Sequence, residues 1–223
     1  MSLWVKICGN TSLEDARVAA EAGADAAGFV FARSPRRVTA DQVAAIVPDL
    51  PSAIEKIGVF VDASAEEIAA AARTCGLTGV QLHSDAGADV AARLRAQFGS
   101  GLRILRVVHF GADAVRLTAE YASDADVDAV LVDSRTAAAV GGTGEAFDWS
   151  EARRTVFRGG GARLVAAGGL TPENVREAIQ TLRPWGVDVV SGVEASPGRK
   201  DADKVRAFVR NARAVQRVGE SAS

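Results

Sequence analysis

Short apolar runs rich in Val, Ile and Leu recur along the chain, and longer stretches rich in Ala, Glu and Arg separate them. The runs are nearly continuous rather than alternating, which is typical of strands buried on both faces of a parallel sheet. We therefore predict strands at Trp4–Cys8, Ala26–Phe31, Lys56–Val61, Gly79–His83, Arg103–His109, Ala129–Asp133, Leu164–Ala167 and Val187–Val190.

The stretches between these runs have helical periodicity, and residues suited to capping a helix mark their starts. The predicted caps are Ser12 with Asp15, Thr39 with Gln42, Ser64 with Glu67, and Thr171 followed by Pro172 at the first helical position. Helices are predicted to end at Gly23, Gly76 and Gly99, because glycine accepts the left-handed conformation that follows a helix.

Strand and helix therefore alternate eight times within 223 residues, which predicts a single-domain (β/α)₈ barrel. We expect the barrel to span residues 1–218 and a frayed tail to occupy residues 219–223. A doubly wound open sheet is the alternative, but the eighth unit and the lack of a G-x-G-x-x-G turn after the first strand disfavour it. In the sixth unit, a long glycine-rich loop precedes a short helix predicted near Asp148–Phe157.

Composition and charge narrow the class of protein. A net charge of −2 with 24% charged and 48% hydrophobic residues is typical of a soluble globular protein. The absence of a basic run argues against nucleic-acid binding, and no apolar stretch is long enough to span a bilayer. The start of the chain lacks the pattern of a signal peptide, so we expect a cytoplasmic protein in which Cys8 and Cys75 are free thiols. The sequence is consistent with either a monomer or a homodimer.

Glycine-bearing stretches at the ends of the last strands point to an anion site. Gly141–Gly144, Ala167–Leu170 and Ser191–Glu194 each follow or end an apolar run, and Pro197-Gly198 comes soon after. Glycine after a strand lets backbone N–H groups approach an anion closely, and a following helix N-terminus adds partial positive charge. We expect these turns to hold one phosphate group of a small-molecule substrate.

Cys8 and Asp133 are the candidates for acid–base chemistry, since barrel enzymes take their active-site groups from the carboxyl ends of strands. A lone cysteine is often a small buried apolar residue, and a strand-end aspartate often anchors a loop. At the mouth of a barrel, however, the two can flank a substrate, one as base and one as acid.

Other polar residues at strand ends are candidates for substrate binding. Arg36, in the loop after the second strand, suits a substrate carboxylate, although loop arginines are usually solvated. Gln81 and His83 end the fourth strand and His109 ends the fifth; each histidine is either a base or structural. Lys6 and Cys8 are two positions apart in the first strand, so both side chains should point into the barrel, with Lys6 one layer deeper. We expect Lys6 to pair with an inward acid such as Asp188. The sequence contains no metal-ligand spacing and no cofactor motif, so we expect neither group.

These motifs together resemble the phosphoribosylanthranilate isomerases of tryptophan biosynthesis. The combination of a Lys-Ile-Cys-Gly start with a Gly-Gly-Thr-Gly…Phe-Asp-Trp block is specific to that family, whereas one glycine loop is not. The matching segments are Val5–Gly9, Gly28–Phe31, Ser34–Arg36, Gly58–Val61, Val80–His83, Gly141–Gly144, Phe147–Trp149, Ala167–Leu170 and Ser191–Glu194.

The resemblance implies a cofactor-free isomerase that opens the ribose of N-(5-phosphoribosyl)anthranilate and performs an Amadori rearrangement. It assigns Cys8 as general base, Asp133 as general acid and Arg36 as the contact of the anthranilate carboxylate. The implied phosphate site lies around Gly142, Thr143, Gly144, Gly168, Gly169, Ser191 and Gly192. The chain departs from the family pattern at Ser84, Ser134 and Val190. These assignments require a thiol pKa lowered by its surroundings and a raised carboxyl pKa.

Three alternatives remain. A related isomerase of the histidine pathway resembles this chain in its phosphate loops, but such enzymes have an aspartate where Cys8 stands. A Schiff-base aldolase needs a lysine at a strand end, and the strand lysines are Lys6 and Lys56. A non-catalytic protein that binds a phosphorylated ligand is the third.

Overall fold

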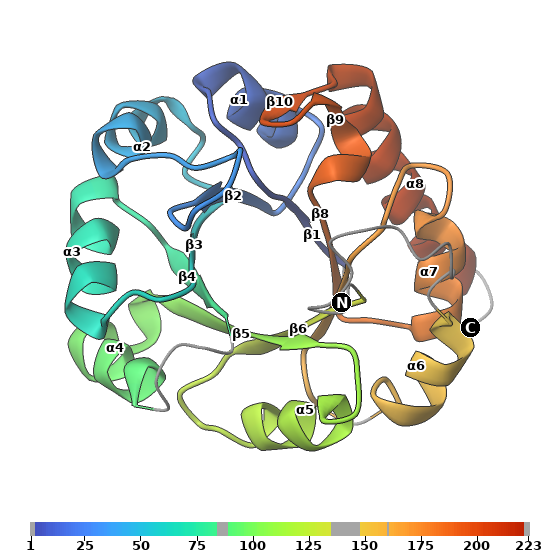
Figure 1. Cartoon of the computed structure of the whole chain (residues 1–223). Helices are drawn as coiled ribbons and strands as arrows, with labels where there is room; N and C mark the ends of the chain where they lie inside the picture. Colours follow the sequence, from blue (N-terminus) through green and yellow to red (C-terminus); the bar gives the residue numbers. More distant parts are fainter. Residues whose placement is uncertain (1–2, 84–88, 135–147, 160, 221–223) are drawn as a thin grey trace.

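The computed structural model describes residues 3–83, 89–134, 148–159 and 161–220. Within them, parallel strands close into a barrel in chain order, and the last strand pairs with the first (Figure 1). This closure confirms the (β/α)₈ prediction and rules out the open sheet. The barrel strands are β1 (Trp4–Ile7), β2 (Ala26–Val30), β3 (Glu55–Phe60), β4 (Gly79–Leu82), β5 (Arg103–His109), β6 (Ala129–Asp133), β7 (Leu164–Ala167) and β8 (Gly186–Val189).

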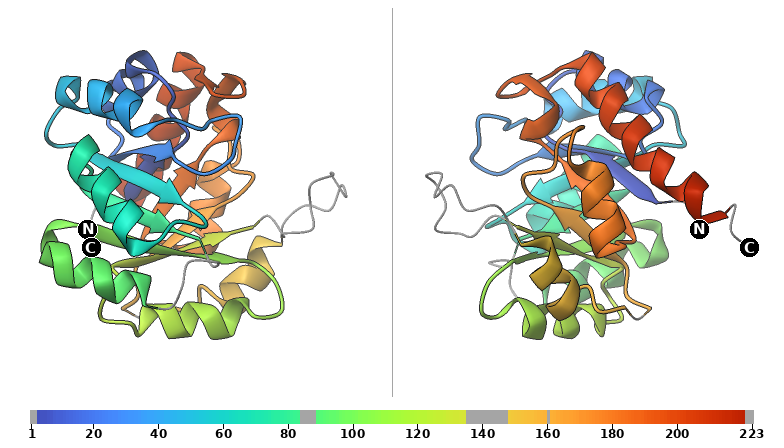
Figure 2. Two further views of the ribbon diagram at one scale, coloured as in Figure 1. Left: turned by 60° about the vertical axis from the view of Figure 1, so that its left-hand side comes forward. Right: turned by 90° about the vertical axis from the view of Figure 1, so that its right-hand side faces the viewer.

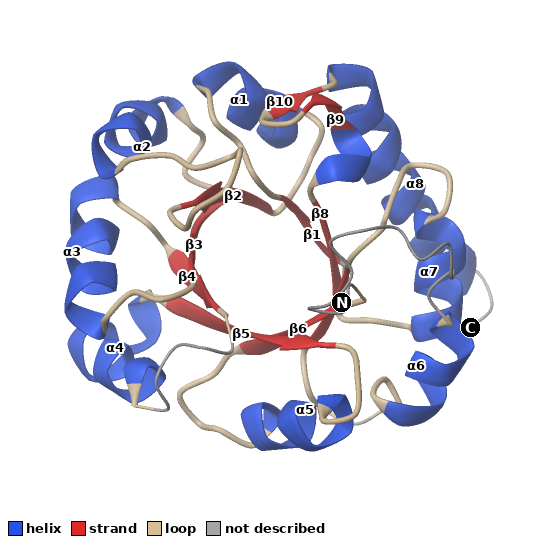
Figure 3. Cartoon of the chain, in the orientation of Figure 1, coloured by secondary structure: helices blue, strands red, loops and turns tan. Residues whose placement is uncertain are grey.

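Helices form an outer ring around the barrel (Figure 3). They are α1 (Leu13–Glu21), α2 (Ala40–Ile46), α3 (Ala65–Cys75), α4 (Val90–Phe98), α5 (Ala114–Ala122), α6 (Trp149–Thr155), α7 (Val175–Leu182) and α8 (Ala202–Glu220). Short 3₁₀ turns occur at Val47–Asp49, Gly99–Gly101 and Ser191–Val193. No helix of the described residues is long and apolar enough to cross a membrane.

Most predicted helix ends are confirmed. Thr39 and Gln42 form a reciprocal capping box at the start of α2, and Gly76 ends α3 in the left-handed conformation. The start predicted at Pro172 is wrong, because α7 begins at Val175. The Thr171 N–H donates to Asn174 Oδ1, and the Glu173 N–H donates to Thr171 Oγ1. These local bonds stabilise a turn in place of the first helical turn.

Apolar side chains fill the lower barrel, toward the start of the strands. Ile57, Leu105 and Leu131 belong to this inner layer, and below it the rings of Trp4 and Trp185 stack with centroids 5.3 Å apart. A second apolar layer lies between the strands and the helices. Because the lower barrel is filled, inward polar groups gather toward the carboxyl ends of the strands.

A two-stranded hairpin after β8 is absent from the predicted pattern. It consists of β9 (Glu194–Ser196) and β10 (Arg199–Lys200), with Pro197-Gly198 in the turn. Gly198 has φ +82°, and its carbonyl accepts a 2.6 Å hydrogen bond from Thr11 Oγ1. The hairpin therefore packs on the connection between β1 and α1. Figure 1 shows β10 beside α1, and Figure 2 gives two further views of the same arrangement.

The tail expected at residues 219–223 overlaps α8, which continues through Gly219 and Glu220, and residues 221–223 lie outside the described part. The domain bounds otherwise stay a prediction.

Thr39→Ala should lower the free energy of unfolding by about 1 kcal/mol, because it removes the side-chain acceptor of the α2 cap. Denaturant unfolding measures the change. Thr39→Ser is the matched control, since it keeps the hydroxyl; an equal loss in both variants would contradict the role of the cap.

Candidate active site

Cys8 immediately follows β1 and faces the barrel interior. Its N–H donates to the Val189 carbonyl at 2.9 Å, and the residue is 3% exposed. A Cβ placed on Gly28 of the neighbouring strand would lie 2.6 Å from Cys8 Sγ and 2.9 Å from Lys6 Cε. The missing side chain at Gly28 therefore provides the space that the thiol and the lysine stem occupy.

Lys6 lies one layer below Cys8 and is fully buried. Its Nζ donates to Asp188 Oδ1 at 2.9 Å and to Gln81 Oε1 at 2.8 Å, so one ammonium joins β1, β4 and β8. The predicted pairing with Asp188 is confirmed. Burial lowers the pKa of Lys6, but Asp188 and Cys8 raise it more, so the net shift is upward and the group stays charged.

The Cys8 thiol has a raised pKa. Burial is the largest cause; Lys6 opposes it, Asp188 adds to it, and Lys200 opposes it from above. The expected lowering of this pKa is therefore wrong for this structure. Two cations lie near the sulfur, but loss of hydration of a thiolate outweighs them.

Asp133 ends β6 and lies against the loop that follows β7. Gly168 has φ +86°, and a Cβ there would collide with the Asp133 carboxylate and with Ser134. Gly192, in the loop after β8, likewise has no room for a Cβ beside the Leu170 carbonyl. A small cavity is lined by Asp133, Gly168, Gly169, Asp188 and Ser191, among others. The structure thus brings the predicted acid together with two of the three predicted phosphate loops.

The remaining predicted site residues are more dispersed. His83 follows β4, and its ring centroid is 5.9 Å from that of His109 at the end of β5, on the side of the barrel opposite β1 and β8. Gln81 lies deeper than a mouth residue and is bound to Lys6. Gly142, Thr143, Gly144 and Ser84 lie outside the described residues.

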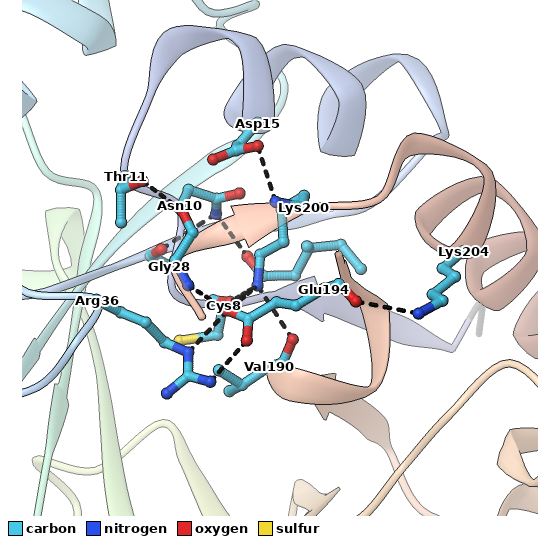
Figure 4. A network of polar contacts seen from close by, with 12 residues as sticks. Cys8, Asn10, Thr11, Asp15, Gly28, Arg36, Val190, Glu194, Lys200 and Lys204 are labelled. Atoms are coloured by element: carbon cyan, nitrogen blue, oxygen red, sulfur yellow. Dashed lines mark hydrogen bonds and ion pairs between the residues drawn. The ribbon is translucent and has the colours of Figure 1, made fainter. Parts of the chain in front are cut away.

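Arg36 is already paired with a carboxylate of the chain itself. Its Nε donates to Glu194 Oε1 at 2.7 Å and its Nη2 to Glu194 Oε2 at 2.6 Å (Figure 4). Lys200 Nζ, on the same hairpin, donates to the carbonyls of Cys8 and Val190 at 2.6 and 3.1 Å and to Glu194 Oε1 at 3.4 Å. Glu194 and Lys200 are not found among the polar residues at the ends of the barrel strands, because both lie in the hairpin that follows β8. The signal for them was the Ser191–Glu194 stretch with the Pro197-Gly198 turn.

Neither of the two lysines on the barrel strands, Lys6 and Lys56, reaches the mouth as a free amine. Lys6 is buried in its ion pair, and Lys56 Nζ donates to the Pro51 carbonyl at 2.8 Å, at the start of β3. This placement disfavours the Schiff-base alternative. Among the described residues, no group of three or more His, Cys, Asp or Glu side chains is arranged to hold a metal ion.

Comparison with known proteins agrees with the geometry. Residues 5–211 match the family model for N-(5'phosphoribosyl)anthranilate (PRA) isomerase. A relative of that name from Trichlorobacter lovleyi is 44% identical over 210 residues, which cover 94% of this chain and 97% of the relative. One from Rubrobacter xylanophilus is 44% identical over 206 residues, covering 92% and 96%.

Solved structures give the same result. The phosphoribosyl anthranilate isomerase of Thermotoga maritima superposes with a TM-score of 0.84 at 37% identity, covering 95% of this chain and 99% of that one. A second structure of such an isomerase, in complex with reduced 1-(o-carboxyphenylamino)-1-deoxyribulose 5-phosphate, gives 0.80 at 35% identity, with coverage of 95% and 99%. The chain belongs to the N-(5'-phosphoribosyl)anthranilate isomerase family.

Proposed function

We propose that the chain converts N-(5-phosphoribosyl)anthranilate to 1-(2-carboxyphenylamino)-1-deoxyribulose 5-phosphate, using its own side chains as acid and base. The observation that carries the proposal is the placement of Cys8 and Asp133 after or at the ends of β1 and β6, with glycine loops on the two strands between them. A cytoplasmic location and a monomer or homodimer stay predictions from the sequence.

The substrate is held at its two anionic ends. Backbone N–H groups around Gly168, Gly169, Ser191 and Gly192 bind the phosphate, joined by the loop of Gly142–Gly144. Arg36 binds the anthranilate carboxylate at the other end. Fixing both ends places the reacting sugar carbons between Cys8 and Asp133. Gln81 acts through Lys6, and His83 lines the far side of the mouth.

The acid and base act in sequence on the bound sugar. Asp133 gives a proton to the furanose oxygen as its bond to C1′ breaks, and the nitrogen lone pair forms the C=N bond. The Cys8 thiolate then removes the C2′ proton, and the electron pair moves toward nitrogen to give an enolamine that tautomerises to the ketone. The buried thiol must therefore ionise, and the charges of Lys6 and Lys200 favour the thiolate.

Cys8→Ala and Asp133→Asn should each fold but lose turnover by about 10²- to 10⁴-fold, because each removes a proton-transfer group. A coupled assay with freshly generated phosphoribosylanthranilate measures the loss. Cys75→Ala is the control, since Cys75 is buried in the apolar layer between the strands and the helices, away from the barrel mouth, where its Sγ donates to the Ala40 carbonyl at 3.4 Å. Near-normal turnover in either first variant would refute its assigned role. Assaying the histidine-pathway aminoaldose alongside tests that alternative.

Lys6→Met should displace the ionisation of Cys8 to higher pH, because the ammonium that favours the thiolate is lost. Asp188→Asn should displace it to lower pH, since Asp188 raises the pKa of the thiol. The pH dependence of alkylation by iodoacetamide, in a Cys75→Ala background, measures both. Shifts of the same sign in the two variants would show that these charges do not control the thiol.

Gly28→Ala should reduce turnover at least about tenfold, because the new methyl group would displace the thiol that lies 2.6 Å from its position. Gly111→Ala is the matched control, since a Cβ there meets nothing within 4 Å. Steady-state kinetics and the melting temperature of both variants separate a loss of activity from a loss of folding. Full activity in Gly28→Ala would contradict the placement of the base.

A further inference from the structure

The pairing of Arg36 with Glu194 restricts how this arginine can meet a substrate. A guanidinium has five N–H donors, and a carboxylate can bind it on the side edge formed by Nε and Nη2 or on the end edge formed by Nη1 and Nη2. Glu194 occupies the side edge with two bonds. Nη1 makes no hydrogen bond to a residue in the described ranges, so the end edge is the one left for a ligand.

Glu194 is fixed from several directions. Its side chain is 4% exposed, and Oε1 also accepts the Gly198 N–H at 3.2 Å from the hairpin turn. Burial raises the pKa of Glu194, but the bonds and charges of Arg36 and Lys200 lower it more, so the net shift is downward. The plane of the guanidinium is thus set by a carboxylate that stays ionised and cannot move freely.

Lys200 supplies the charge that this arrangement needs. Burial lowers the pKa of Lys200, whereas the charges of Glu194 and Cys8 oppose that shift. All three of its N–H donors have acceptors, namely two backbone carbonyls and Glu194, which is the pattern of a protonated amine. Arg36, Lys200 and Glu194 together carry one net positive charge. Without Lys200 the pair of Arg36 and Glu194 would be neutral, and a second carboxylate would meet repulsion from Glu194.

We propose that Glu194 is a positioning residue that turns the Nη1–Nη2 edge of Arg36 toward the substrate carboxylate, and that Lys200 provides the counter-charge that lets one guanidinium serve two carboxylates. This inference rests on the proposed function. It gives the hairpin a role in selecting arylamine substrates that carry a carboxylate. Lys200 also binds the Cys8 carbonyl, so the position of this clamp is tied to that of the base.

The test compares two inhibitors in wild type and Glu194→Gln. One is reduced 1-(o-carboxyphenylamino)-1-deoxyribulose 5-phosphate, and the other is the same molecule without its carboxyl group. We expect the variant to weaken the carboxylate inhibitor by about 10- to 100-fold, because losing the two charge-assisted bonds that orient Arg36 outweighs the repulsion by Glu194 that is removed with them. The inhibitor without the carboxyl group should bind within about twofold of wild type, and KM should rise more than kcat falls.

Controls make each outcome decisive. Arg199→Gln, an exposed change on the same hairpin, should leave both inhibition constants unchanged. Equal weakening of both inhibitors in Glu194→Gln, or no change in either, would overturn the inference. If Glu194→Gln fails to fold, Glu194→Asp, which keeps the charge but shortens the reach, should show the same selective loss or refute it.

Failure of the proposed function is a separate result. It would appear as absent turnover in the wild type, and dissociation constants of the two inhibitors from calorimetry would then still test the orientation of Arg36.

Discussion

The ammonium of Lys6 is the group on which the site depends. It is buried inside the barrel, bound to Asp188 and Gln81, and it lies directly below the cysteine that follows β1. A buried ion pair adds little to stability in general, because loss of hydration offsets much of the attraction between the charges. Its effect here is local: it places a fixed positive charge under the thiol and holds three strands in a defined relation. The apolar layer and the stacked tryptophans beneath it keep water away from that charge.

Burial and reactivity oppose each other at Cys8. The same closure that removes water from the barrel raises the pKa of the thiol, although a base must ionise to act. The structure moderates this conflict with cations on two sides, Lys6 from below and Lys200 from above, and with the absent side chain of Gly28. Asp188 works against the thiolate, so the ion pair that holds Lys6 also weakens its influence on the sulfur. The reactivity of Cys8 is thus set by a small difference between larger effects.

Features encoded by local patterns were predictable from the sequence, and features made by distant residues were not. Strand bounds agree within one residue, and the cap at Thr39 follows from residues three positions apart. The pairing of Lys6 with Asp188 was predictable because strand parity fixes which side chains face inward. The pairing of Arg36 with Glu194 spans 158 positions and depends on a hairpin with no strong strand signal. The direction in which the pKa of the Cys8 thiol is shifted was also not predictable from the sequence, because it depends on the extent of burial as well as on the neighbouring charges.

In the proposed mechanism, the hairpin after β8 couples the ionisation of Cys8 electrostatically to the binding of the substrate carboxylate. Arg36 and Lys200 both interact with Cys8 through their charges, and both bind Glu194. With the proposed roles, the thiolate and the substrate carboxylate are therefore two anions served by the same cations. Linkage then requires reciprocity: a bound carboxylate makes the thiol harder to ionise to the same extent that a thiolate weakens binding of the carboxylate. Lys6 escapes this competition, because it lies below the sulfur in its own ion pair with Asp188. Separate cations therefore allow the site to bind an anionic substrate through Arg36 while Lys6 continues to favour the thiolate form of the base.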